Sequence, residues 1–327
     1  MIKSRIAVYC VFALAWLISA GTPMAAEYPL RPIHIVVGYP PGGLTDIVAR
    51  AVAERFQEKL GQPGIVDNRP GAGSELAMSL VARAVADGYT LLFGVASMTI
   101  NRALKPDMKD DPLPLLRPLG LIGRTGPYVL IARPGLAANN LQELFALARK
   151  APGTITYASY GVGAHNHFIG EWLGSQAKVQ FNHVPYTGST PSLAALMGGH
   201  VDLDIEPLTQ ARPLLESGKA KALAVADVQR SPLLPNVPTM AEAGGTDPLL
   251  ATSWYGLMAP KDTPADILAR LEKATVEISK IPSAVEALKR DGGVIYGTGA
   301  TAFAAFIKEE MDKWRSIAVR ANIKPEQ

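Results

Sequence analysis

The chain has 327 residues, of which 48% are hydrophobic and 19% charged, and its formal net charge is +3 at pH 7. This near-neutral balance excludes the broad basic surface that a nucleic-acid or membrane-surface partner would need. A chain of this length exceeds the usual size of a single hydrophobic core, so we expect a globular protein with two lobes.

The N-terminus has the pattern of a secretory signal peptide. Lys3 and Arg5 precede an apolar stretch at residues 6–20, and small residues follow up to Ala26. The apolar stretch is shorter than the roughly 20 residues that span a bilayer, which favours export over anchoring. We predict a signal peptide at residues 1–26, with cleavage after Ala26 or, alternatively, after Gly21.

The single cysteine, Cys10, lies inside the predicted signal peptide. The mature chain would then contain no thiol. Disulfides, thiol nucleophiles and thiolate metal sites are therefore excluded for the mature protein.

The first half of the mature chain alternates short apolar strands with amphipathic helices. We predict strands at residues 33–37, 64–68 and 90–94, and helices at residues 45–60 and 74–84. This order favours a parallel sheet with helical crossovers. Residues 102–118 contain four prolines and are expected to form a loop or an interrupted helix.

A second set of elements begins at residue 128. Its predicted strands are residues 128–132, 155–157, 182–185, 201–205 and 220–225, and its predicted helices are residues 141–150, 167–176 and 191–197. A strand at 253–258 then precedes helices at 265–278, 282–290 and 300–321. We expect these last helices to cover the first sheet. Domain 1 would then comprise residues 27–124 and 252–327, and domain 2 residues 125–251. Two chain segments would connect the domains and form a hinge.

Two glycine-rich turns, at residues 38–46 and 159–164, each follow a predicted strand and precede a predicted helix. Glycine allows the backbone to approach a ligand closely, and a helix start presents unpaired N–H groups with a partial positive charge. Turns of this kind suit anions. We therefore predict that a carboxylate is held between the two turns.

Several residues of the turns have an alternative structural role. Gly42 and Gly43 could serve only a tight turn, and Thr45 and Asp46 could cap a helix without touching a ligand. His165 could face the cleft or pack inside the fold. For Asp204, two roles remain open: a partner for a ligand amine, or an ordinary residue at a strand end. The Gly-rich segment 68–73 also resembles an anion-binding turn, but Arg69 is expected to form a structural ion pair or a hydrogen-bond bridge.

The sequence gives little support for an enzymatic function. The motifs of serine hydrolases, zinc proteases, phosphate-binding loops and dinucleotide-binding folds are not found. His165 and His167 could share a metal only in an irregular loop, because two-residue spacing separates them on a strand or a helix. Ser159, His165 and an aspartate could form a hydrolytic site only if they aligned. We predict no catalytic residue, cofactor or metal.

Short motifs in order along the chain resemble those of the Bug-type solute-binding proteins of tripartite tricarboxylate transport systems. They lie at residues 28–33, 40–43, 60–62, 67–73, 87–92, 183–186, 237–239 and 254–260. The resemblance implies an α/β fold with two lobes, similar to type II periplasmic binding proteins, with two doubly wound, mostly parallel sheets joined by a two-segment hinge. It also implies a periplasmic location.

The resemblance further implies that the protein binds a small organic carboxylate and delivers it to membrane permease subunits. A periplasmic sensor protein is an alternative partner, and we expect a monomer that binds no nucleic acid. The implied ligand-binding residues are Tyr39, Pro40, Gly42, Gly43, Thr45, Asp46, Ser97, Ser159, Gly161, Gly163, Ala164, His165, Thr187, Gly188 and Asp204. The sequence departs from the family at Ala164, where a Ser or Thr is common, and at Thr187, where a Lys or Arg is frequent.

Overall fold

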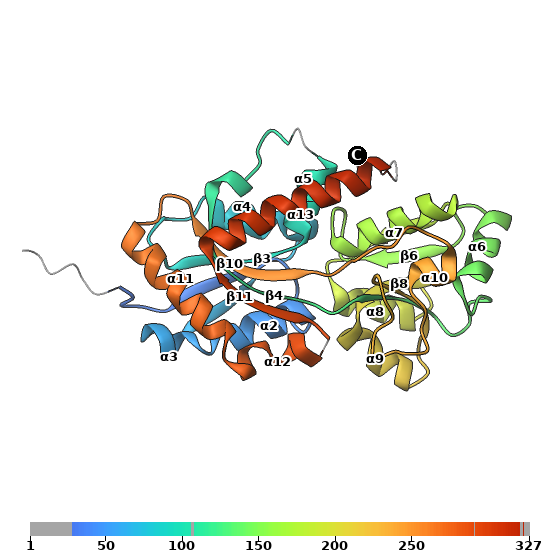
Figure 1. The fold of residues 1–327 in the computed structure, drawn as a ribbon, viewed down its shortest axis with the longest axis horizontal. Coiled ribbons are helices and arrows are strands. Elements are labelled where there is room, and N and C mark those ends of the chain that lie inside the picture. The colour runs from blue at the N-terminus through green and yellow to red at the C-terminus, as the bar shows by residue number, and fades with distance from the viewer. Residues whose placement is uncertain (1–27, 106–107, 291, 321–322, 324–327) are drawn as a thin grey trace, which may run out of the picture. The chain divides into compact units, whose positions relative to one another are not determined.

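The computed structural model describes residues 28–105, 108–290, 292–320 and 323. The predicted signal peptide, its cleavage site and Cys10 lie outside these residues. The described residues from Arg31 onward form one compact unit. Its two sheets define two lobes (Figure 1).

Lobe 1 is built on a six-stranded sheet in the order β11-β4-β10-β3-β1-β2. Strand β1 pairs in parallel with β2 and β3, whereas β10 runs antiparallel to β3 and β4, and β11 antiparallel to β4. The strands are β1 (Ile33–Val37), β2 (Gly64–Asn68), β3 (Thr90–Val95), β4 (Leu116–Arg124), β10 (Trp254–Pro260) and β11 (Val294–Gly299).

The helices of lobe 1 come from both ends of the chain. The N-terminal ones are α2 (Leu44–Ala53), α3 (Phe56–Leu60), α4 (Glu75–Ala82) and α5 (Ser97–Leu104), with 3₁₀ turns η1 (Ala72–Ser74) and η2 (Leu113–Leu115). The C-terminal ones are α11 (Ala265–Ser279), α12 (Pro282–Arg290) and α13 (Ala300–Arg320). The C-terminal helices thus complete the lobe that the N-terminal strands begin (Figure 1).

Lobe 2 is built on a five-stranded sheet in the order β7-β6-β8-β5-β9. Strand β6 pairs in parallel with β7 and β8, and β5 runs antiparallel to β8 and β9. The strands are β5 (Tyr128–Ala132), β6 (Thr156–Ser159), β7 (Asn182–Pro185), β8 (Leu203–Pro207) and β9 (Lys221–Ala226). The helices are α6 (Leu141–Lys150), α7 (His165–Ala177), α8 (Ser189–Met197), α9 (Leu208–Glu216) and α10 (Met240–Gly244).

Apolar strand residues form the cores of the lobes. In lobe 1, Ile33, Ile35 and Val37 of β1 are fully buried, as the apolar run predicts for a strand covered by helices. In lobe 2, Val129 and Ile131 of β5 pack in a cluster with residues of β6, α8, α9 and β9. Burial of these faces, rather than local propensity, fixes the position of the strand ends that carry the site.

The two-lobed α/β class is confirmed, but the expectation of mostly parallel sheets is wrong. Both sheets are mixed. In lobe 1 the returning chain inserts β10 antiparallel between β3 and β4, and in lobe 2 strand β5 lies antiparallel between β8 and β9. Within residues 102–118, expected to form a loop or an interrupted helix, the structure has part of α5, all of η2 and the start of β4.

Two chain segments pass between the lobes side by side. The first joins β4 to β5, and the second leads into β10. The backbone N–H of Thr125 donates to the carbonyl of Ser253 at 2.7 Å, and the N–H of Ser253 donates to Thr125 Oγ1 at 2.9 Å. These bonds tie the crossings together at a position suited to a hinge. The domain boundaries given above remain a prediction.

Across the described part of the chain, no helix combines the length and apolar character that crossing a membrane requires.

Candidate ligand-binding site

A narrow cavity lies where the two lobes meet. Its volume is about 20 Å³, which leaves room for roughly one water molecule. The lining residues come from both lobes: Tyr39, Pro40, Gly43, Leu44, Thr45 and Tyr255 from lobe 1, and Tyr128, Tyr160, Ser189 and Pro207 from lobe 2. None of these lining residues carries a cationic side chain, so any positive potential at this wall must come largely from backbone N–H groups.

The lobes touch around this cavity. The rings of Tyr39 and Tyr160 meet edge to face with centroids 6.0 Å apart. A Cβ atom on Gly188 would lie 2.5 Å from Pro40 Cδ, so the absence of a side chain at residue 188 permits the contact. The structure therefore has the lobes closed, and a ligand larger than water requires them to separate first.

The first glycine-rich turn is held together by Asp46. Its Oδ2 atom accepts hydrogen bonds from Gly42 N at 3.0 Å and Arg50 Nε at 2.9 Å, and its Oδ1 accepts one from Asn68 Nδ2 at 2.9 Å. Burial opposes ionisation, but these donors outweigh it and lower the pKa of Asp46. Asp46 is buried and does not line the cavity, so its contacts favour the structural role for this residue.

Tyr39, Pro40, Gly43 and Thr45 do line the cavity, as the interpretation of the first turn requires. Gly43 is the N-cap of α2 and adopts an extended backbone conformation. The N–H groups that follow it, at the start of α2, have no partner inside the helix by geometry. Thr45 Oγ1 lies 3.3 Å from the hydroxyl of Tyr255.

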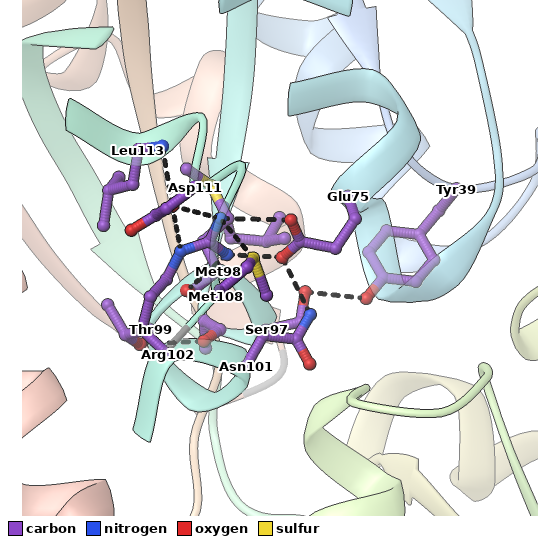
Figure 2. A network of polar contacts seen from close by, with 12 residues as sticks. Tyr39, Glu75, Ser97, Met98, Thr99, Asn101, Arg102, Met108, Asp111 and Leu113 are labelled. Carbon is purple, nitrogen blue, oxygen red and sulfur yellow. Dashed lines mark hydrogen bonds and ion pairs between the residues drawn. The ribbon is translucent and has the colours of Figure 1, made fainter. Parts of the chain in front are cut away.

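Ser97 supports the wall instead of lining the cavity. Its hydroxyl lies 3.0 Å from the Tyr39 hydroxyl, and burial raises the pKa of Tyr39 to about 12. Figure 2 shows Ser97 next to a network in which the buried Arg102 side chain is paired with Glu75 and Asp111. Asn101 also donates to Glu75 Oε1, at 2.9 Å. Helix α5 is thereby fixed to α4 behind Tyr39.

Apart from Tyr160, which lines the cavity, the second glycine-rich turn makes contacts with lobe 1. Gly163 has φ = +80°, and an added Cβ would lie 1.7 Å from Asn101 Oδ1. Gly161 has φ = +115°, and its added Cβ would lie 3.6 Å from Gly73 N. Ala164, the buried N-cap of α7, lies against Gly73 as well. Close backbone approach between the lobes accounts for the small residues here.

Ser159 is hydrogen-bonded away from the cavity. Its Oγ lies 2.6 Å from His183 Nε2 and not beside His165. The hydroxyl is fully buried and also bonds to the backbone of Gly161. Ser159 and His165 are therefore not paired, as a hydrolytic site built on them would require.

His165 packs inside the fold. Its ring lies 4.8 Å from that of Tyr128 and 5.1 Å from that of Trp314, both edge to face. Neither ring nitrogen has a hydrogen-bond partner among the described residues, and burial lowers the pKa of His165 to about 3. Neutral His165 therefore joins α7 of lobe 2 to α13 of lobe 1.

Asp204 lies behind the cavity wall beside Glu206. Both are fully buried on β8, two residues apart and so on the same face of the strand. Burial raises the pKa of Asp204 to about 7, and burial together with the Asp204 carboxyl raises that of Glu206 well above its usual range. Thr187 is exposed. Neither Asp204 nor Thr187 lines the cavity.

The sequence interpretation missed three of the lining residues, Tyr128, Pro207 and Tyr255, whereas Leu44, Tyr160 and Ser189 lie in segments that it assigned to the walls of the site. Tyr128, Pro207 and Tyr255 lie at strand ends near the crossings, and Tyr160 lies inside a turn that had been singled out. Residues at strand ends beside the predicted hinge could therefore have been proposed as lining residues from the sequence. No group of three or more metal-capable side chains occurs among the residues that the structure describes.

A closed cavity between two α/β lobes with paired crossings defines the protein as a two-lobed binding protein. The model of the tripartite tricarboxylate transporter family receptor matches residues 48–323, and the chain belongs to this family. Protein BugT of Bordetella pertussis is 34% identical over 300 residues, covering 91% of this chain and 91% of that protein.

Two solved structures of relatives contain carboxylates. An R. palustris protein with adipate is 32% identical, with a TM-score of 0.83, and covers 92% of this chain and 100% of that chain. MatC from Rhodopseudomonas palustris with bound malate is 31% identical, with a TM-score of 0.82, and covers 89% and 99%. These likenesses support the two-lobed α/β fold derived above.

Proposed function

We propose that this protein binds a small organic dicarboxylate in the interlobe cavity, in the periplasm, and delivers it to the permease subunits of a tripartite tricarboxylate-type transporter. The observation that carries the proposal is the start of α2, where Gly43, Leu44 and Thr45 open onto the cavity between the lobes. Their N–H groups suit one carboxylate, since the lining offers no cationic side chain.

Closure supplies the second part of the mechanism. In the open protein the carboxylate reaches the α2 start from solvent, and lobe 2 then covers it with Tyr160 and Ser189. Exclusion of water strengthens the hydrogen bonds to the ligand, because the effective dielectric constant falls. The adipate and malate bound to relatives support dicarboxylates as the ligand class. The closed protein is the form that a permease would recognise.

A thermal-shift screen of the chain from Glu27 onward tests the proposal. A ligand that binds only the folded state adds about 2.7 kcal/mol of stability at a hundredfold excess over its Kd. We expect succinate, malate or adipate to raise the Tm, and the matching diamide to leave it unchanged. An equal shift with the diamide, or no shift with any carboxylate, would contradict carboxylate binding.

A further inference from the structure

Glu206 is the centre of a buried cluster of hydroxyl donors behind the cavity wall. Its Oε2 atom accepts the hydroxyl of Tyr160 at 2.5 Å and that of Ser189 at 2.8 Å. Its Oε1 atom accepts the hydroxyl of Ser192 at 3.0 Å. Tyr160 and Ser189 line the cavity, whereas Ser192 does not. One buried carboxyl thus orients two hydroxyl groups of the lobe 2 wall.

The elements around Glu206 offer it no basic partner. The groups acting on the two carboxyls are Asp204 on the same strand, Tyr160 from the turn before α7, and Ser189 and Ser192 from α8. Strand β5 places Val129 opposite Glu206 and Ile131 opposite Asp204. Burial and mutual repulsion raise the pKa of both carboxyls, so the pair keeps at least one proton at neutral pH, since ionising both would be costly.

The hydroxyl groups of Tyr160 and Ser189 therefore give their only protons to Oε2. Burial and the Glu206 charge raise the pKa of Tyr160 well above its usual value, so this phenol keeps its proton. A hydroxyl whose proton is committed can still accept a hydrogen bond through its lone pairs. Towards the cavity, both oxygens then act as acceptors.

We propose that Glu206 makes the lobe 2 wall a hydrogen-bond acceptor, so that the site selects carboxylates carrying a hydroxyl or ammonium group on the carbon chain. This inference rests on the proposed function: the start of α2 holds a carboxylate, and Tyr160 and Ser189 receive the donor. A second carboxylate oxygen placed against this wall would meet lone pairs. A site lined by hydrogen-bond acceptors discriminates strongly against ligands without a donor, because such ligands leave the buried acceptors of the site unpaired.

Titration calorimetry of the mature protein with matched ligands tests the proposal. The pairs are malate or aspartate against succinate, and 2-hydroxyadipate or 2-aminoadipate against adipate. We expect at least one donor-bearing ligand to bind about tenfold more tightly than its plain counterpart. Equal affinity within both sets, with carboxylates still binding, overturns the inference and leaves the proposed function standing. Failure of every carboxylate to bind overturns the proposed function itself.

Three variants separate positioning by Glu206 from a purely structural role. Ser189→Ala removes one acceptor, and Glu206→Met frees both hydroxyls to rotate and donate, so each variant should bring the affinity ratio of a matched pair towards one. Ser192→Ala removes a donor to the same carboxyl away from the cavity, and it should keep the wild-type ratio. An affinity ratio that is unchanged in Ser189→Ala contradicts the proposal, and so does a ratio that falls as much in Ser192→Ala as in Ser189→Ala. Both outcomes can be read even if Glu206→Met does not fold.

Discussion

Gly163 of lobe 2 leaves room for the Asn101 side chain of lobe 1. We predict that Gly163→Ala weakens carboxylate binding about tenfold, since the new Cβ would lie 1.7 Å from Asn101 Oδ1 and keep the lobes apart. The positive φ of +80° adds a strain of about 1 kcal/mol that acts on stability. Calorimetric titration measures the affinity, and urea unfolding measures the stability.

Two companion variants of Gly163→Ala isolate the clash. Adding Asn101→Ala should recover affinity but not the stability lost to strain. Gly199→Ala carries the same kind of strain, at φ = +72°, with nothing within 4 Å of the new Cβ. It should lose stability and keep wild-type affinity. Wild-type affinity in Gly163→Ala itself would remove this contact from the mechanism of closure.

The burial of Asp204 predicts a pH-dependent stability. Burial raises the pKa of Asp204 in the folded state to about 7, from the 3.8 that is usual for an aspartate, so between these two pH values the folded state binds more protons than the unfolded chain. The free energy of unfolding should therefore fall as the pH rises from about 4 to 7 and level off above that. Relative to Asp204→Asn, we expect the wild type to lose about 3 kcal/mol between pH 5 and pH 8.

Urea unfolding at those two pH values measures the loss. Parallel pH profiles of the wild type and Asp204→Asn would contradict the buried, protonated state of this carboxyl.

Residue types in the sequence predicted the cavity lining from the first glycine-rich turn better than the lining from lobe 2. Tyr39, Pro40, Gly43 and Thr45 line the cavity because a strand, a turn and a helix start are local features of the sequence. The partners of His165 and Ser159 were not predictable, since they come from residues far away in the chain. Glu206 was missed although it shares a strand face with Asp204, which had been singled out.

At the scale of elements, helix α13 connects the lobes. Trp314 packs edge to face on His165 and Phe168 of α7, at centroid distances of 5.1 and 5.0 Å, and its Nε1 donates to Glu310 at 2.9 Å. The same helix packs on α5 of lobe 1. In Figure 1, the C-terminal end of α13 extends towards α7. We infer that this contact stabilises the closed arrangement.

Trp314→Ala should therefore lower both stability and ligand affinity. Truncating a buried Trp costs about 3–5 kcal/mol of stability, and the part that belongs to the closed state would appear as roughly tenfold weaker binding. Val319→Ala, on the same helix but 75% exposed, is the matched control and should change neither. A Trp314→Ala protein with reduced Tm and unchanged affinity would show that α13 stabilises the fold without affecting closure.

Regular elements were predictable where the chain alternates clearly, and less so where proline and glycine interrupt it. Strand β1 has the predicted bounds, whereas the predicted helix at 45–60 is divided into α2 and α3. Strand β4 was missed because Pro118 and two glycines weaken its pattern, yet β10 and β11 pair with it on both sides. Tertiary pairing fixes such a strand, and one sequence does not display it.

At the scale of the whole molecule, the chain length and the order of the family motifs predicted two lobes. The structure shows which residues connect the lobes and which residues lie between them. The two crossings are bonded to each other at Thr125 and Ser253, and we infer that the lobes rotate about this short region. The cavity of about 20 Å³ is too small for a dicarboxylate, so binding and release must involve that rotation.

A pulsed electron–electron distance measurement between spin labels on the two lobes tests this account most directly. The mature chain has no cysteine of its own if the signal peptide carries Cys10, so Ile47→Cys on α2 and Met197→Cys on α8, both exposed, can be labelled selectively. We expect a broad distribution that includes long distances without ligand, and a single short distance with a saturating carboxylate. An identical distribution in both conditions would contradict capture by lobe closure.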